Sequence, residues 1–316
     1  MKGVPETALR WHREGRGAAI AFVTRTWGSA PVPAGSMLAV AGDGEMAGSV
    51  SGGCVEGAVV LEAQDALADG ARRHLEYGVP DGDAFAVGLA CGGTIRILVE
   101  PVGGPLSEEA LARIVAARAA ARPVGWRAGP DGQGAVIGPG DAPEAFAADR
   151  SGEEDGAFVA VMNPPLRLAV VGGVHIAQAL VPMARIAGYA PTVIDPREAF
   201  ASAARFPGAA LVHDWPDAAM EAFAPDARTA VVLLTHDPKL DDPALVQALA
   251  STAFYIGALG SSRTHASRLG RLRAAGMAER DVARIDAPVG LDIGARGPAE
   301  IAVAILGAMT MALRRP

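Results

Sequence analysis

The sequence predicts an α/β protein in two parts. The first is an N-terminal α+β domain with a glycine-rich cysteine loop, and the second is a C-terminal Rossmann-like domain with a doubly wound parallel sheet. From residue 166 onward, short apolar runs alternate with helical patterns, whereas a mixed order of elements precedes them. A stiff break, Asn163-Pro164-Pro165, separates the two. We therefore expect domains at residues 1–121 and 164–316, joined by a linker or small β extension at residues 122–163.

Composition restricts the class of protein. Of the 316 residues, 50% are hydrophobic and 20% are charged, which is ample for packed cores. A net charge of −7 gives no basic footprint for nucleic acid or an anionic membrane. Charged residues interrupt any signal-peptide core near the N-terminus, and the apolar run at 301–313 is too short to span a bilayer. We expect a cytoplasmic protein whose two cysteines, Cys54 and Cys91, are free thiols.

The elements of the first part follow from apolar patterning. Continuous apolar runs predict buried strands, and apolar residues at helical spacing predict helices. The Asp-Gly turn at residues 42–45 is typical of a hairpin, and Ser107 is a suitable N-cap. The expected helices cover residues 6–15, 55–70 and 107–121, and the expected strands cover residues 18–23, 37–40 and 94–100, with strand-like pieces at 135–137 and 157–162.

A glycine-rich loop from Gly48 to Gly57 is the most informative stretch of the first part. It leads directly into the helix expected from residue 55, so we expect Cys54 in the first helical turn. Free backbone N–H groups and the helix dipole favour an anion there, and glycines allow a ligand to approach closely. The loop is therefore a candidate anion-binding site with the soft sulfur ligand of Cys54 beside it. The alternative is a tight turn with a structural cysteine.

A second turn of the same type, Cys91-Gly92-Gly93, lies just before the strand expected at residues 94–100. Two such turns in one small domain suggest that both face one site.

The second part opens with the layout of a dinucleotide-binding unit. A strand at residues 166–171, a glycine turn, a helix at 175–187 and a strand at 192–194 lead to Asp195, which lies 23 positions after Gly172. Strands are also expected at residues 209–212, 230–235 and 253–257, and helices at 243–250, 263–275 and from 298 onward.

The glycine fingerprint itself is altered. Val174 stands at the second glycine position, where the backbone must nearly touch a pyrophosphate, and a β-branched residue there resists positive φ. An NAD(P)-dependent oxidoreductase and a scaffold without a nucleotide are therefore both open interpretations.

Polar residues follow several of these strands at the edge where open α/β sheets bind ligands. His175 and Asp195 are joined there by Arg197, a candidate phosphate ligand, and by the pairs His213-Asp214 and His236-Asp237. A metal site, an anion site or an acid–base pair is one hypothesis, and helix caps and turn residues are the other.

Taken together, the motifs resemble the XdhC/CoxI family of accessory proteins for xanthine dehydrogenase and related molybdenum hydroxylases. The segments that carry the resemblance are TRTWGSAPVPAGSMLAV, GSVSGGCVEG, GLACGGTIRILVEP, VVGGVHIAQAL with VIDPR, LTHDP, YIGALGSSRT and APVGLDIGARGPAEIA. Cys54 matches the family's functional cysteine and Cys91 its second CGG turn. The chain departs from the family where Val174 replaces the glycine of Gly-Ala-Gly-His.

The resemblance implies a chaperone that binds molybdenum cofactor, protects it while it acquires its terminal sulfur, and inserts it into an apo molybdenum hydroxylase. It also implies a cysteine desulfurase as partner, and a homodimer. The alternatives are an NAD(P)-dependent oxidoreductase and a protein–protein adaptor with structural glycine turns. The expected metal-contacting residue is Cys54, and no catalytic residue is expected. The expected cofactor-binding residues are Gly48, Ser49, Ser51, Gly52, Gly53, Cys54, Glu56, Cys91, Gly92, Gly93, Gly172, His175, Asp195 and Arg197.

Overall fold

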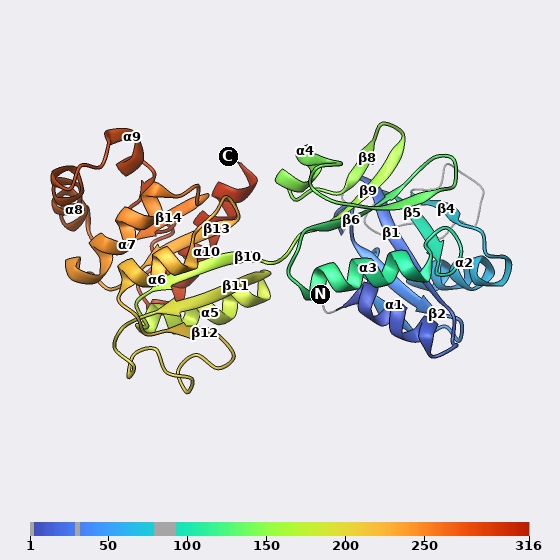
Figure 1. Ribbon diagram of the computed structural model, residues 1–316, viewed down its shortest axis with the longest axis horizontal. Coiled ribbons are helices and arrows are strands. Elements are labelled where there is room, and N and C mark those ends of the chain that lie inside the picture. The colour runs from blue at the N-terminus through green and yellow to red at the C-terminus, as the bar shows by residue number, and fades with distance from the viewer. Residues whose placement is uncertain (1–2, 29–31, 79–92, 316) are drawn as a thin grey trace. The chain divides into compact units, whose positions relative to one another are not determined.

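The computed structural model describes residues 3–28, 32–78 and 93–315. The chain divides into two compact units, Met1–Pro164 and Pro165–Pro316 (Figure 1). Within the described residues, no helix combines the length and apolar character needed to cross a membrane.

The first unit is built on a five-stranded antiparallel sheet. Its strands are β1 (Ala18–Trp27), β2 (Met37–Ala41), β3 (Met46–Gly48), β4 (Arg73–Tyr77) and β5 (Thr94–Pro101). Their order in the sheet is β3-β2-β1-β5-β4, which places the apolar strand β1 at the centre. Both faces of this strand are buried, in agreement with its continuous apolar sequence.

Different layers cover the two faces of this sheet. Helix α2 (Glu56–Asp69) packs through Val59, Ala63 and Ala66 against one face. Helices α1 (Val4–Arg13) and α3 (Glu108–Ala119) pack against the other face.

Residues 122–163, for which the sequence offered a linker or a small β extension, form a second antiparallel sheet inside the first unit (Figure 1). It contains β6 (Val124–Ala128), β7 (Gly134–Ile137), β8 (Gly152–Glu154) and β9 (Ala157–Met162) in the order β7-β6-β9-β8, with the short helix α4 (Pro143–Ala147). Trp126 and Phe158 of this sheet join the same core as α1 and α3.

Strand register places the end of β3 and the start of β5 toward the same end of the first sheet. Trp27, at the end of β1, pairs with Thr94 at the start of β5, while Gly48, at the end of β3, pairs with Leu38 near the start of β2. Gly48 and the start of β5 therefore lie toward the same end of the sheet, the end at which β1 finishes. Cys91 and Gly92 lie outside the described residues.

The second unit confirms the predicted doubly wound parallel sheet. Six parallel strands are arranged in the order β12-β11-β10-β13-β14-β15. They are β10 (Leu166–Val171), β11 (Tyr189–Ile194), β12 (Ala210–Val212), β13 (Thr229–Leu233), β14 (Tyr255–Ala258) and β15 (Ile285–Asp286). Chain order reverses between β10 and β13, so the ligand crevice of such a fold lies at the carboxyl ends of these two strands.

Helices cover both faces of the parallel sheet (Figure 1). Helices α5 (His175–Ile186) and α10 (Pro298–Arg314) pack on one face. Helices α6 (Pro216–Phe223), α7 (Pro238–Ala250), α8 (Ser262–Ala274) and α9 (Glu279–Val282) pack on the other face. The expected start of α7 at residue 243 was wrong, because Asp237 caps the helix and Pro238 occupies its first position.

Candidate functional site

Cys54 is a free, exposed thiol at the edge of the first sheet. The sequence predicted Cys54 in the first turn of a helix, but the residue lies two positions before the helix begins. Helix α2 begins at Glu56, and its N-cap is Val55, which has the non-helical angles φ −122° and ψ 0°. Cys54 therefore precedes the cap, so its side chain is carried by the glycine loop rather than by the helix.

The interior of this loop is already filled by a carboxylate of the chain itself. Oε1 of Glu56 accepts hydrogen bonds from Ser49 Oγ at 2.6 Å, from Ser51 N at 2.9 Å and from Val50 N at 3.2 Å. Oε2 accepts from Gly53 N at 2.9 Å and from Ser51 Oγ. The loop does form an anion cradle, as the sequence suggested, but the anion it holds is Glu56.

The same contacts set the charge state of Glu56. The residue is 5% exposed, and this burial on its own would raise the pKa of the carboxyl group. Hydrogen bonds from Ser49, Ser51 and the loop backbone outweigh the burial and lower the pKa to about 2. Glu56 is therefore ionised at physiological pH, with all of its contacts made inside the protein.

Exposed glycines stand on both sides of Cys54 in the sequence. Gly52, Gly53 and Gly57 are exposed like Cys54 itself. A methyl group added at Gly53 or Gly57 would meet no atom within 4 Å. The N-cap residue Val55 makes no side-chain cap hydrogen bond, its own N–H donates to Ser51 Oγ, and the N–H of Glu56 acts on its own carboxylate. The next N–H groups of the first turn, from Gly57 on, have no intrahelical partners. A ligand can therefore approach the thiol and the helix end together.

The glycines of the loop have different roles. Gly48 has φ +103°, and an added methyl group would lie 2.3 Å from the carbonyl oxygen of Met37, so packing alone requires a glycine there. Gly53 has φ +113° but faces open space, so its conformation requires a glycine. Gly57 lies in the helix with ordinary φ and faces open space, so neither conformation nor packing requires it. It was not among the predicted site residues, although a glycine at the second position of a helix is a visible sequence signal.

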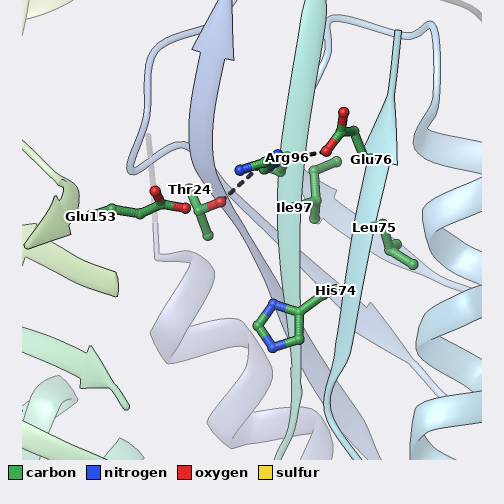
Figure 2. A pocket seen from close by; sticks show the side chains of 7 residues that line it. All are labelled: Thr24, His74, Leu75, Glu76, Arg96, Ile97 and Glu153. Atoms are coloured by element: carbon green, nitrogen blue, oxygen red, sulfur yellow. Dashed lines mark hydrogen bonds and ion pairs between the residues drawn. The ribbon is translucent and has the colours of Figure 1, made fainter. Parts of the chain in front are cut away.

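A polar pocket of about 290 Å³ lies elsewhere in the first unit (Figure 2). Leu75 and Ile97 point into the core beneath α2, so the alternating residues His74, Glu76 and Arg96 stand on the opposite face of the sheet. Arg96 is bound to Glu76 at 2.6 Å, and its guanidinium covers Trp27 at 5.0 Å from the ring centroid. Sequence reasoning missed this pocket, because its charged residues are typical of a solvated strand face. The lining residues are Thr24, His74, Leu75, Glu76, Arg96, Ile97 and Glu153.

The glycine turn of the second unit is also filled by its own chain. Gly172 has φ +105°, and Val174 is the N-cap of α5 with φ −88°, so the β-branched residue is accommodated without strain. The N–H of Gly173 donates to Asp195 Oδ2 at 2.9 Å. A methyl group at Gly173 would lie 2.5 Å from the carbonyl oxygen of Phe200, so the segment after β11 lies directly against the turn.

Asp195 and Arg197, both predicted to contact a ligand, contact each other. The carboxylate accepts from Arg197 N at 3.0 Å, Nε at 2.8 Å and Nη2 at 2.8 Å, in addition to Gly173. Burial would raise the pKa of Asp195, but these donors, Arg197 first, keep the pKa below its usual value. The carboxylate is 1% exposed, so a ribose could reach it only after Arg197 had moved.

The histidines near this crevice have different surroundings: His236 interacts electrostatically with the carboxylate of Asp241. His175 is the exposed first residue of α5, and the ring of His213 contacts the carbonyl oxygen of Ala201 at 2.7 Å. Asp237 caps α7 by accepting from Lys239 N at 2.9 Å. Among the residues described, no group of three or more His, Cys, Asp or Glu side chains is arranged to hold a metal ion. The helix-cap interpretation therefore accounts for Asp237.

Comparison with known proteins gives matches in both units. Residues 11–78 match the family model "XdhC and CoxI family", and residues 168–309 match "XdhC Rossmann domain". The molybdenum cofactor insertion chaperone PaoD of Escherichia coli is 32% identical over 293 residues, covering 92% of this chain and 82% of that protein. A protein of Bacillus subtilis described as a probable xanthine dehydrogenase subunit is 30% identical over 159 residues, covering 50% of this chain and 46% of that protein.

A solved structure has the same fold over nearly the whole chain. The crystal structure of a xanthine dehydrogenase from Bacillus halodurans aligns with a TM-score of 0.78 and 25% identity, covering 99% of this chain and 97% of that one.

Proposed function

The chain belongs to the XdhC and CoxI family, and from this premise we propose that it binds molybdenum cofactor and inserts it into an apo molybdenum hydroxylase. The 32% identity to a molybdenum cofactor insertion chaperone over most of both chains supports this role. The observation that carries the proposal is the exposed Cys54 thiol just before the N-terminus of α2, among the exposed glycines Gly52, Gly53 and Gly57.

The residues at this surface fit the chemistry of the cofactor. Molybdenum is bound well by soft sulfur ligands, and Cys54 offers one at the surface. The N–H groups of the first helical turn suit oxo or phosphate oxygens. Gly53 and Gly57 leave room for a bulky ligand to lie against the backbone. The cofactor is the cargo here, so the work of the chain is to hold, shield and release it.

The finer parts of the proposal concern the steps around binding. The chain would protect the cofactor while it receives its terminal sulfur from a cysteine desulfurase, and would deliver it as a cytoplasmic homodimer. The match to the probable xanthine dehydrogenase protein of Bacillus subtilis supports a hydroxylase of that class as the recipient. Under this proposal the protein performs no catalysis of its own.

An NAD(P)-dependent oxidoreductase receives less support from the geometry. Asp195 would have to recognise the ribose, yet both of its oxygens are taken by Gly173 and Arg197. The exposed thiol of Cys54 would also have no part in hydride transfer.

Cofactor retention after desalting tests the proposal. Purified protein is loaded with molybdenum cofactor, desalted and assayed for bound cofactor, with Cys54→Ala and Cys91→Ala compared to the wild type. We expect the wild type to retain stoichiometric cofactor and Cys54→Ala to retain little. Equal retention by Cys54→Ala would move the site away from this loop, and no retention by the wild type would refute the chaperone function.

A further inference from the structure

The Glu56 carboxylate is the centre of a hydrogen-bond network that includes most of the loop around Cys54. The carboxylate collects five donors from Ser49, Val50, Ser51 and Gly53, all within seven residues of the helix start. Ser49 Oγ in turn accepts from Gly52 N at 2.9 Å, and Ser51 Oγ accepts from Val55 N at 2.9 Å. Every residue from 49 to 53, and Val55 on the far side of the thiol, is thus fixed directly or through one serine to Glu56.

We propose that Glu56 is the positioning residue of the cofactor site: it is an internal anion that holds the glycine loop in one conformation and so fixes Cys54. This inference rests on the proposed function, and it reassigns Glu56 from contacting the cofactor to acting through Cys54. The side chain of an ordinary helix cap accepts hydrogen bonds from N–H groups of the helix. The Glu56 side chain instead turns back and accepts hydrogen bonds from the N–H groups of the preceding loop. Apart from its own N–H, its side chain therefore leaves the N–H groups of the first helical turn to a ligand.

Because Glu56 fills the cradle, the loop offers the thiol of Cys54, and not its backbone N–H groups, to a ligand. Backbone N–H groups of Val50, Ser51 and Gly53 already point at the carboxylate, so an external phosphate cannot use them. The loop therefore presents sulfur to the ligand, and the anionic groups of the ligand are left to the outer N–H groups of α2.

A missing carboxylate can be replaced from solution, and this gives a specific test. The Glu56→Ala variant retains the donors but lacks the acceptor, so acetate or formate should bind in the empty cradle. A ligand that binds only the folded form raises the melting temperature as its concentration rises. Acetamide at the same concentration, and chloride at the same ionic strength, are the controls because neither supplies a carboxylate. Glu56→Gln is the matched variant, since its side chain fills the cradle and excludes acetate.

Three readouts follow the loop independently of one another. We expect the melting temperature of Glu56→Ala to rise with acetate while that of the wild type and of Glu56→Gln does not. The amides of Val50, Ser51 and Gly53 should exchange hydrogen faster in Glu56→Ala and slow again in acetate. Cofactor retention should fall roughly tenfold or more in Glu56→Ala and recover with acetate, because one lost hydrogen bond to a charged group lowers the population of the ordered, binding-competent loop by about that factor.

The outcomes separate this inference from the proposed function. Wild-type retention of cofactor by Glu56→Ala, or loss of retention that acetate fails to restore while exchange protection does return, would overturn the positioning role. If Glu56→Ala does not fold, Ser49→Ala removes a single donor, and unchanged exchange at Gly52 and unchanged retention would overturn it instead. Absence of cofactor on the wild type would refute the proposed function, whereas acetate rescue of stability and exchange would still be measurable.

Discussion

Substitution of Gly57 by alanine should raise stability and weaken cofactor binding at the same time. Gly57 is the second residue of α2, has ordinary helical φ, and an added methyl group would meet nothing within 4 Å. Alanine is favoured over glycine in a helix by about 0.5–1 kcal/mol, because glycine loses more backbone freedom on folding. For a unit of 164 residues, we expect this to raise the melting temperature by roughly 1–4 °C.

The expected loss of binding follows from the same open space. A cofactor that lies against Gly53, Cys54 and Gly57 would have to move away from the helix end to accommodate the methyl group. Forced repacking of this kind costs about 1–3 kcal/mol, which is a loss of affinity of roughly fivefold to 150-fold. The assay is a titration of the purified variant with molybdenum cofactor, alongside thermal unfolding of the same preparation.

Gly270 supplies the control. It is an exposed glycine within α8 of the second unit, and an added methyl group there also meets nothing within 4 Å. Gly270→Ala should therefore stabilise its own helix and leave cofactor affinity unchanged. A Gly57→Ala variant that is more stable and binds cofactor like the wild type would refute the placement of the ligand at the end of α2.

Two further predictions concern the internal carboxylates. Because the pKa of Glu56 falls to about 2 on folding, its stabilisation is present above the unfolded value of 4.5 and is lost as pH falls toward 2. The stability difference between wild type and Glu56→Gln should thus be on the order of 3 kcal/mol above pH ~5 and should narrow toward pH ~2 in denaturant titrations; a gap independent of pH would contradict this. Arg197→Ala should destabilise the second unit by about 1–3 kcal/mol and make Asp195 accessible, so that calorimetry detects NAD binding only in the variant. Saturable NAD binding by the wild type would show that Arg197 does not block the crevice.

Elements with one clear apolar pattern were predictable from the sequence. Strand β10, its glycine turn, α5 and β11 follow from local apolar runs, and the parallel sheet follows from their alternation with helices. Strand β4 was missed, because its residues Arg73–Tyr77 alternate between polar and half-buried positions at the edge of the sheet. Strand β6 was missed for a different reason: Gly125 and Arg127 break the apolar pattern, and the strand is buried by tertiary packing, between β7 and β9 and against the core of α1 and α3.

The residues of the candidate site were predictable from the sequence, but the group that their N–H and O–H donors bind was not. Glycines and serines before a helix indicate an anion cradle, and the cradle is present. No local pattern states whether the anion comes from solution or from the chain. Glu56 could be seen in the motif, but the turn of its side chain back toward Ser49 depends on the φ values of Gly52 and Gly53, which a sequence does not specify.

The Gly48–Gly57 loop and the Gly172–Gly173 turn each hold a carboxylate of the chain, yet they leave different surfaces exposed. In the second unit Arg197 covers Asp195, and the backbone of Phe200 lies against Gly173. Other parts of the chain therefore occupy the space beside this turn. In the first unit Glu56 lies inside the loop, and Cys54 and Gly57 face outward. An internal anion therefore closes one turn and rigidifies the other around an exposed thiol. Since binding costs less when the contacting groups are already ordered, the Cys54 loop is the turn that is prepared for a ligand.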